Sequence, residues 1–186
     1  SDLAHLHFVA AEEYRRRVIQ LGEQPDRTFN VGAMALDCIE RLPNLSVEDL
    51  QQEIGFEISS PLFLVTYHPV TLIEEGSKKA FEELAHALLA FEDATVVITK
   101  SNADAEGRAI NLFIDDFAAS HPKVHAVTSL GQRRYLGLMR NADVVVGNSS
   151  SGILEAPAIG VPTVNIGERQ RGRLRSPSVI DCDEER

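Results

Sequence analysis

Short apolar runs alternate along the chain with segments whose apolar residues recur every three or four positions. The clearest runs are Leu62–Thr66 and Ala94–Thr99. Runs of this kind are typical of strands that are buried on both faces of a parallel sheet. Between these two runs, Phe81, Leu84 and Leu88 fall on one face of a helix. The pattern predicts strands that are separated by helices.

The same pattern continues on both sides of this region. Further strands are predicted at residues 6–10, 29–32, 124–127, 142–146 and 161–166. Further helices are predicted at residues 14–21, 35–42, 46–54, 110–117, 135–139 and 151–159, with Ser46 as the N-cap of the third. Parallel neighbouring strands need crossover connections, which are almost always right-handed. We therefore expect an α/β fold with a doubly wound parallel sheet.

No domain boundary stands out, so the sequence predicts a single domain over residues 1–186. The least regular stretch is Gly32–Gly55, where a helix could cross towards a neighbouring domain. The chain begins at Ser1 without a Met, and Asp181–Arg186 resembles the opening of a helix that is cut off. We therefore expect a piece of a longer protein.

Composition narrows the classes of partner. The chain has 18 Lys and Arg against 28 Asp and Glu, a formal net charge of −10. This balance argues against binding to nucleic acid or to an anionic membrane, although a local pocket can still be basic. No apolar run approaches the roughly 18 residues that a membrane helix needs. Cys38 and Cys182 form no disulfide framework, and no Cys/His cluster has zinc-ligand spacing. A reducing, cytoplasmic compartment and no metal are expected.

Polar loops follow four of the predicted strands. Ligands of doubly wound sheets bind at the carboxyl ends of the strands, so these loops are expected to open onto one edge. The loops are Tyr67–Thr71, Lys100–Asp104, Gly147–Gly152 and Gly167–Arg173.

The loop Gly147–Gly152 carries the strongest chemical signal. It joins a strand to a helix and reads Gly-Asn-Ser-Ser-Ser-Gly. Small residues at a helix N-terminus offer backbone N–H groups, hydroxyl groups and the positive end of the helix dipole, which suit a diphosphate. The loop is neither a Walker loop nor G-x-G-x-x-G. A plain strand–helix turn, with Ser151 as the N-cap, is an equal alternative.

Glu155 and His68 are candidates for two further roles. Glu155 lies about one helical turn beyond the serines, where a carboxylate can accept hydrogen bonds from ribose hydroxyls; the alternative is a solvated helix charge. His68 follows a buried strand and precedes Pro69, which biases the histidine to an extended conformation. A histidine held there can bind phosphate or transfer a proton. The other histidines are expected to be structural.

Asn102 and Arg169 complete the candidates. The Asn102 amide could bind a base edge or a phosphate, or could serve a turn. Arg169 belongs to a cluster with Arg171 and Arg173, and a guanidinium can bind two phosphate oxygens at once. Such a cluster could equally be a surface patch.

Four motifs together resemble a known family. They are Thr66-Tyr67-His68-Pro69-Val70-Thr71, Asn102-Ala103-Asp104, Gly147-Asn148-Ser149-Ser150-Ser151-Gly152-Ile153-Leu154-Glu155-Ala156-Pro157 and Val164-Asn165-Ile166-Gly167-Glu168-Arg169-Gln170. In this order they resemble the hydrolysing UDP-N-acetylglucosamine 2-epimerases, as does the opening His5–Ala10. The resemblance covers essentially the whole chain. It is weaker to the non-hydrolysing epimerases.

The resemblance implies a GT-B fold, in which two Rossmann-like halves face each other across a cleft. The chain resembles the C-terminal half, which holds most of the UDP. The N-terminal partner domain, with its acidic residues that handle protons on the sugar, has no counterpart here. Activity of the isolated chain is therefore in doubt. The full-length form is expected to be a homo-oligomer that needs no cofactor.

The resemblance also implies roles for six residues. The catalytic residue is His68, beside the substrate diphosphate, and the residues that bind UDP are His68, Asn102, Ser149, Ser150, Glu155 and Arg169. In the family, UDP is eliminated across C1–C2 of the sugar, and water then adds to the glucal to release N-acetylmannosamine or a relative. A UDP-sugar-binding module of a GT-B glycosyltransferase is the alternative. UDP-N-acetylglucosamine and a diacetamido-dideoxy relative both suit this half.

Overall fold

The computed structural model describes residues 4–69, 74–101 and 105–184, and it divides the chain into two compact units. Unit 1 is Ser1–Leu42 and unit 2 is Pro43–Arg186. The sequence predicts one domain over residues 1–186, and this stays a prediction. The division falls within Gly32–Gly55, the stretch with the weakest periodicity.

Unit 1 is a small βαβ arrangement followed by one more helix. Its elements are β1 (His7–Val9), α1 (Glu12–Gln20), a short 3₁₀ turn (Pro25–Arg27), β2 (Thr28–Asn30) and α2 (Met34–Arg41). β1 and β2 pair in parallel, with His7 opposite Thr28. Arg15 of α1 contacts β2: its Nε donates a hydrogen bond to the Thr28 carbonyl at 2.7 Å. Both predicted strands are confirmed, with shorter bounds.

Unit 2 contains the large sheet. Its elements are α3 (Val47–Ile54), β3 (Leu62–Thr66), α4 (Glu74–Leu89), β4 (Thr95–Thr99), α5 (Ala105–Ser120), β5 (Val124–Val127), α6 (Gly131–Asn141), β6 (Val144–Gly147), α7 (Ser150–Ile159), β7 (Thr163–Ile166) and β8 (Val179–Cys182). The strands lie in the order β5-β4-β3-β6-β7-β8, and every neighbouring pair is parallel. The predicted doubly wound parallel sheet is confirmed.

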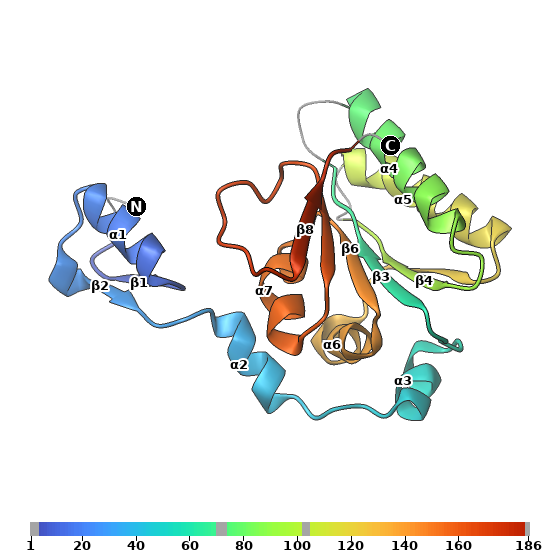
Figure 1. The fold of residues 1–186 in the computed structure, drawn as a ribbon, viewed down its shortest axis with the longest axis horizontal. Helices are drawn as coiled ribbons and strands as arrows, with labels where there is room; N and C mark the ends of the chain where they lie inside the picture. The colour runs from blue at the N-terminus through green and yellow to red at the C-terminus, as the bar shows by residue number, and fades with distance from the viewer. Residues whose placement is uncertain (1–3, 70–73, 102–104, 185–186) are drawn as a thin grey trace. The chain divides into compact units, whose positions relative to one another are not determined.

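Helices cover both faces of this sheet (Figure 1). Alternate side chains of β3 show the two layers: Val65 packs in one apolar cluster with residues of α4 and α5, while Leu64 packs in a second with residues of α3, α6 and α7. All five residues of β3 are buried. This double cover explains why the strand sequences are apolar almost throughout, without alternation.

The strand order reverses beside β3. β4 and β5 lie on one side of it, and β6, β7 and β8 lie on the other. The connections that leave β3 and β6 therefore diverge to opposite faces, which opens a crevice between them at the carboxyl edge. The loop after β3 begins with Tyr67 and His68, and the loop after β6 carries Asn148 and Ser149. The topology thus places the two strongest candidate loops next to each other.

Two details of the sequence prediction are wrong. Asp181 and Cys182 lie in β8, an edge strand that was not predicted, and do not open a helix. Asp181 is held there by Asn165, whose Nδ2 donates to its Oδ1 at 2.7 Å, and by Arg175 at 3.2 Å. α6 is also longer than the predicted 135–139. The predicted cap is confirmed: the Ser46 hydroxyl accepts from the Asp49 N–H at 3.0 Å. None of the described helices has the length and hydropathy to cross a membrane.

Candidate functional site

The loops that follow β3, β4, β6 and β7 leave the same edge of the sheet. Thr66, the last residue of β3, is in register with Thr99 of β4 and with Gly147 of β6. Gly147 is in turn in register with Asn165 of β7. Because all these strands are parallel, their carboxyl ends meet at one edge. For the described residues, the expectation that the polar loops converge is confirmed.

A single side chain joins the loop after β3 to the loop after β6. The Asn148 amide is fully buried and bonds both backbone groups of His68. Its Oδ1 accepts from the His68 N–H at 2.7 Å, and its Nδ2 donates to the His68 carbonyl at 2.8 Å. These two bonds, with the buried Pro69 that follows, fix the backbone of His68. The His68 side chain itself is half-buried.

The backbone of Asn148 also holds the loop after β7. Its carbonyl accepts from Arg169 Nη1 at 3.0 Å and from Gln170 Nε2 at 2.7 Å. Gln170 is 1% exposed, whereas Arg169 is exposed at the surface. Asn148 therefore fixes His68 on one side and Arg169 on the other. Two of the predicted ligands are placed by a residue that the sequence analysis did not single out.

Gly147 allows the start of the loop after β6 to lie close to the end of β3. Its φ is +131°, a conformation that L side chains rarely adopt, and a Cβ built there would lie 2.1 Å from the Thr66 carbonyl oxygen. The Asn148 N–H donates to that same oxygen at 3.1 Å. Only glycine lets the chain turn out of β6 against the end of β3.

A second asparagine holds the loop after β4 in the same way. Asn111 of α5 accepts from the Ser101 N–H at 2.9 Å through Oδ1, and its Nδ2 donates to the Ser101 carbonyl at 3.1 Å. The Ser101 hydroxyl donates to the Tyr67 carbonyl at 2.6 Å, which joins this loop to the loop after β3. The predicted ligand Asn102 comes next in the chain and lies outside the described residues.

The serines lie at the start of α7. Ser149 is the N-cap, since its hydroxyl accepts from the Ser151 N–H at 3.4 Å, so the alternative that made Ser151 the cap is wrong. Ser150 is the first residue of the helix, and both Ser149 and Ser150 are half-buried. The first N–H groups of a helix lack intrahelical acceptors, and they carry the positive end of its dipole. This end of α7 can accommodate an anion.

Charged groups near the serines are partly removed from water. Burial raises the pKa of the Glu155 carboxyl, which is half-buried rather than a fully solvated helix charge. Arg169 is exposed as a whole, but its guanidinium is partly shielded where it contacts the Asn148 carbonyl. This partial burial and the nearby Arg173 charge lower the pKa of the guanidinium. Arg171 pairs instead with Glu168, at 2.9 Å on the exposed surface. A carboxylate in this position is stabilised by hydroxyl donors, and a guanidinium by an anion.

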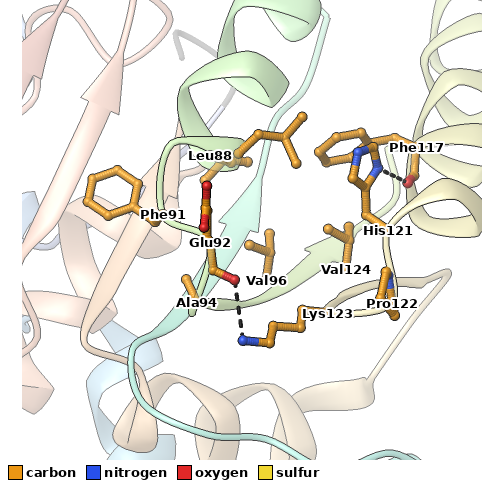
Figure 2. A pocket seen from close by; sticks show the side chains of 11 residues that line it. Leu88, Phe91, Glu92, Ala94, Val96, Phe117, His121, Pro122, Lys123 and Val124 are labelled. Carbon is orange, nitrogen blue, oxygen red and sulfur yellow. Dashed lines mark hydrogen bonds between the residues drawn. The ribbon is translucent and has the colours of Figure 1, made fainter.

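Two apolar hollows are lined by residues outside these loops. A cavity of about 280 Å³ is formed by the ends of α4 and α5 and the starts of β4 and β5, at the amino edge of the sheet; Figure 2 shows Leu88, Phe91, Phe117 and His121 around it. A groove of about 440 Å³ lies between α4 and β8. In the described part of the chain, the lining of both contains none of the predicted site residues. The polar loops at the carboxyl edge are therefore the better candidate site.

These features define a class: a doubly wound α/β protein whose polar loops and helix N-terminus meet at the carboxyl edge of a parallel sheet. The model of a family described as UDP-N-acetylglucosamine 2-epimerase matches residues 1–186. The chain belongs to this family, and the resemblance inferred from its motifs is confirmed.

Curated relatives agree with this assignment. The chain is 39% identical over 184 residues to the GDP/UDP-N,N'-diacetylbacillosamine 2-epimerase (hydrolyzing) of Campylobacter jejuni, covering 98% of this chain and 48% of the relative. It is 34% identical over 187 residues to the polysialic acid biosynthesis protein P7 of Escherichia coli, covering 100% of this chain and 47% of the relative. The chain spans about half the length of the curated relatives it matches, and corresponds to their C-terminal half.

A solved structure supports the fold. The UDP-GlcNAc 2-epimerase of Neisseria meningitidis, determined with UDP-GlcNAc bound, superposes with a TM-score of 0.74 at 20% identity. The match covers 88% of this chain and 44% of that one. The fold is that of one half of a GT-B protein, as the family resemblance implied.

Proposed function

We propose that this chain is the UDP-binding half of a hydrolysing UDP-sugar 2-epimerase. The observation that supports this most is the position of Asn148, which joins His68 and Arg169 beside the N-terminus of α7. Three loops that carry phosphate-binding side chains are thereby held at one point of the sheet edge. Membership of the epimerase family supplies the class of substrate.

The proposed arrangement of UDP follows from the charges at this edge. The diphosphate lies against Ser149, Ser150 and the first N–H groups of α7, where the helix dipole favours an anion. Arg169 neutralises part of its charge, and His68 donates to it from the opposite loop. Glu155, one turn into α7, accepts from the ribose hydroxyls. Those donors offset the loss of water around the carboxylate that its raised pKa reflects.

The proposed reaction uses these contacts as charge develops. The C1–O bond of the sugar breaks, UDP leaves with the electron pair, and a base outside this chain removes the C2 proton to give a glucal. Water then restores hydrogen at C2 and supplies the hydroxyl at C1. Hydroxyls, helix N–H groups, Arg169 and His68 stabilise the diphosphate as it leaves. The base belongs to the half of the relatives that this chain does not span.

The test is made on a protein that joins these 186 residues to the other half. It is incubated with UDP-N-acetylglucosamine and, separately, with a UDP-diacetamido-dideoxy sugar in deuterium oxide. We expect UDP and a free 2-epimerised sugar that carries one deuterium at C2. A UDP-linked epimer would indicate a non-hydrolysing enzyme. UDP release that requires an added acceptor would indicate a glycosyltransferase, and no release from either sugar would contradict the proposal.

Three further statements belong to this proposal. The sugar is N-acetylated, in a pathway of the sialic acid type, because the two relatives described above are named for bacillosamine and polysialic acid. The protein works in the cytoplasm as a homo-oligomer, together with the partner domain. Light scattering and cell fractionation of the protein with both halves test the assembly and the compartment.

A further inference from the structure

A row of hydroxyl groups runs from the end of the sheet to the start of α7. The Thr99 and Thr66 hydroxyls are 2.6 Å apart, and Thr66 is 3.4 Å from the Tyr135 hydroxyl. Tyr135 is 2.6 Å from the Ser151 hydroxyl, which donates to the Ser149 hydroxyl at 3.1 Å. Tyr135 comes from α6, so it reaches the serines from a different element.

The direction of these bonds follows from counting protons, because each hydroxyl donates only one. Ser151 donates its proton to Ser149, so in the 2.6 Å contact Tyr135 donates to Ser151. Thr99 donates to the Val65 carbonyl at 3.3 Å, so Thr66 donates to Thr99. Neither Thr66 nor Tyr135 then donates to the other. This agrees with their oxygen–oxygen distance of 3.4 Å, the longest in the row. The bonds therefore run outward from Tyr135 to Ser149.

Ser149 stands at the outer end of this row. It accepts from the Ser151 N–H and from the Ser151 hydroxyl, so its own proton is used in neither contact. Hydrogen bonds in a chain polarise one another, and a hydroxyl that accepts two bonds is a better donor. Ser149 is only half-buried, so its proton can be donated to a ligand at the sheet edge.

Tyr135 is kept in its donor form by its surroundings. Burial raises the pKa of its phenol, and the negative charge of Glu155 raises it further. The phenol therefore carries its proton throughout the neutral range. The hydrogen bonds to Ser151 and Thr66 act in the opposite direction and do not outweigh the burial.

We propose that Tyr135 is a positioning residue for the diphosphate: its hydroxyl donates to Ser151 and so directs the Ser149 proton outward, to a phosphate oxygen. The inference rests on the proposed function, because it assumes that Ser149 faces the diphosphate. Tyr135 itself does not touch the phosphates. Removing its hydroxyl leaves Ser151 free to turn, and the Ser149 proton is no longer fixed in direction.

The experiment measures the binding of UDP and of uridine to the 186-residue chain by calorimetry. We expect Tyr135→Phe to weaken UDP binding about three- to tenfold and to leave uridine binding unchanged. Ser151→Ala should have a similar effect on UDP. The double variant should bind UDP no more weakly than Ser151→Ala alone, because the link through Ser151 is already lost.

The control is Ser59→Ala, which removes the hydroxyl of an exposed residue that is bonded to Thr95 at 3.0 Å, at the amino edge of the sheet. It should change neither affinity. Equal losses of UDP and uridine binding in Tyr135→Phe would mean that Tyr135 is only structural, and additive losses in the double variant would also overturn the inference. If the unaltered chain binds UDP no better than uridine, the proposed function fails as well. If it prefers UDP and Tyr135→Phe keeps that preference, only the inference fails.

Discussion

At the scale of single residues, the site depends on amide side chains that bond the backbone of other loops. Asn148 and Asn111 each bond the N–H and the carbonyl of one residue, His68 and Ser101 respectively. These contacts are made with backbone atoms of His68 and Ser101, not with their side chains. A substitution of the His68 imidazole therefore leaves the path of its loop intact.

The first prediction concerns His68. In the protein with both halves, His68→Ala is expected to lower kcat about 10²–10⁴-fold while changing the affinity for UDP much less. The reason is that a donor to the leaving diphosphate stabilises the transition state more than the ground state. Steady-state kinetics and UDP titration separate the two effects. An unchanged kcat in both His68→Ala and His68→Gln would assign His68 a binding or structural role.

The second prediction concerns Glu155. Because burial raises the pKa of this carboxyl in the folded state, the folded chain binds its proton more tightly than the unfolded chain. The stability that results is present below the unfolded pKa of about 4.3 and is lost as the pH rises through the folded value. Glu155→Gln avoids this loss. At pH 7 the free energy of unfolding of Glu155→Gln should therefore be higher than that of the unaltered chain. The difference should be less than about 1 kcal/mol, because the carboxyl is half-exposed.

Denaturant unfolding at several pH values measures this difference. The advantage of Glu155→Gln should disappear at about pH 3.5, below the unfolded pKa. The matched control is Glu168→Gln, whose carboxylate is exposed and pairs with Arg171 on the surface. An exposed pair of this kind contributes little, so the control should follow the unaltered chain. A Glu155→Gln variant that is less stable at pH 7 would contradict the argument.

At the scale of elements, Ser149 has two proposed roles: it caps α7, and it binds the diphosphate. The cap of α3 by Ser46 provides a comparison that separates them. Ser149→Ala together with Ser150→Ala should lower the free energy of unfolding by about 1 kcal/mol through the lost cap. It should also weaken UDP binding at least about tenfold while affecting uridine far less, because each hydrogen bond to a charged group contributes about 1.5–3 kcal/mol. Calorimetry with both ligands gives the ratio.

Ser46→Ala is the control for this variant. Ser46 caps α3 through the Asp49 N–H, as Ser149 caps α7, but it lies apart from the carboxyl-edge loops. We expect a similar loss of stability and no change in UDP binding. If the two variants weaken UDP binding equally, the serine loop acts only through stability.

A further prediction concerns the turn out of β6. Gly147→Ala should destabilise the chain by at least about 3 kcal/mol, since φ is +131° and the added Cβ meets the Thr66 carbonyl at 2.1 Å. Gly160→Ala is the comparison: φ is +90°, but nothing lies within 4 Å of its Cβ, so about 1–2 kcal/mol is expected. Chemical denaturation measures both. Similar losses would mean that the approach to Thr66 is not the limiting contact.

The elements show what a single sequence can predict. Leu62–Thr66 and Ala94–Thr99 were recognised because strands covered on both faces are apolar throughout. Val179–Cys182 was missed because β8 is an edge strand with three exposed residues, and the acidic residues around it resemble a helix start. The role of Asn148 was missed for another reason: His68, its partner, is 80 residues away in the chain. The residues next to Asn148 in the sequence do not indicate that its side chain contacts His68.

At the scale of the whole molecule, the division into two units allows a prediction of which unit UDP protects from hydrogen exchange. UDP bound at the carboxyl edge should slow amide hydrogen exchange in β3, β6 and the start of α7, because binding stabilises the folded state of the part that it contacts. β1 and β2 of unit 1 should exchange at the same rate with and without UDP. Exchange measured by mass spectrometry distinguishes the two. Protection confined to unit 1 would place the nucleotide elsewhere.

The strand order has a consequence for the order of folding. β3 is in register with β6, and Val65 lies opposite Val146, so the central pair of the sheet joins segments about 80 residues apart in the chain. β3 and β4 can pair as soon as both are synthesised, but the other side of β3 stays empty until β6 emerges. Contacts of such long sequence separation slow the overall rate of folding. The edge that holds His68 and Ser149 cannot form before β6 has been synthesised, so a nascent chain that stops before β6 has no such edge.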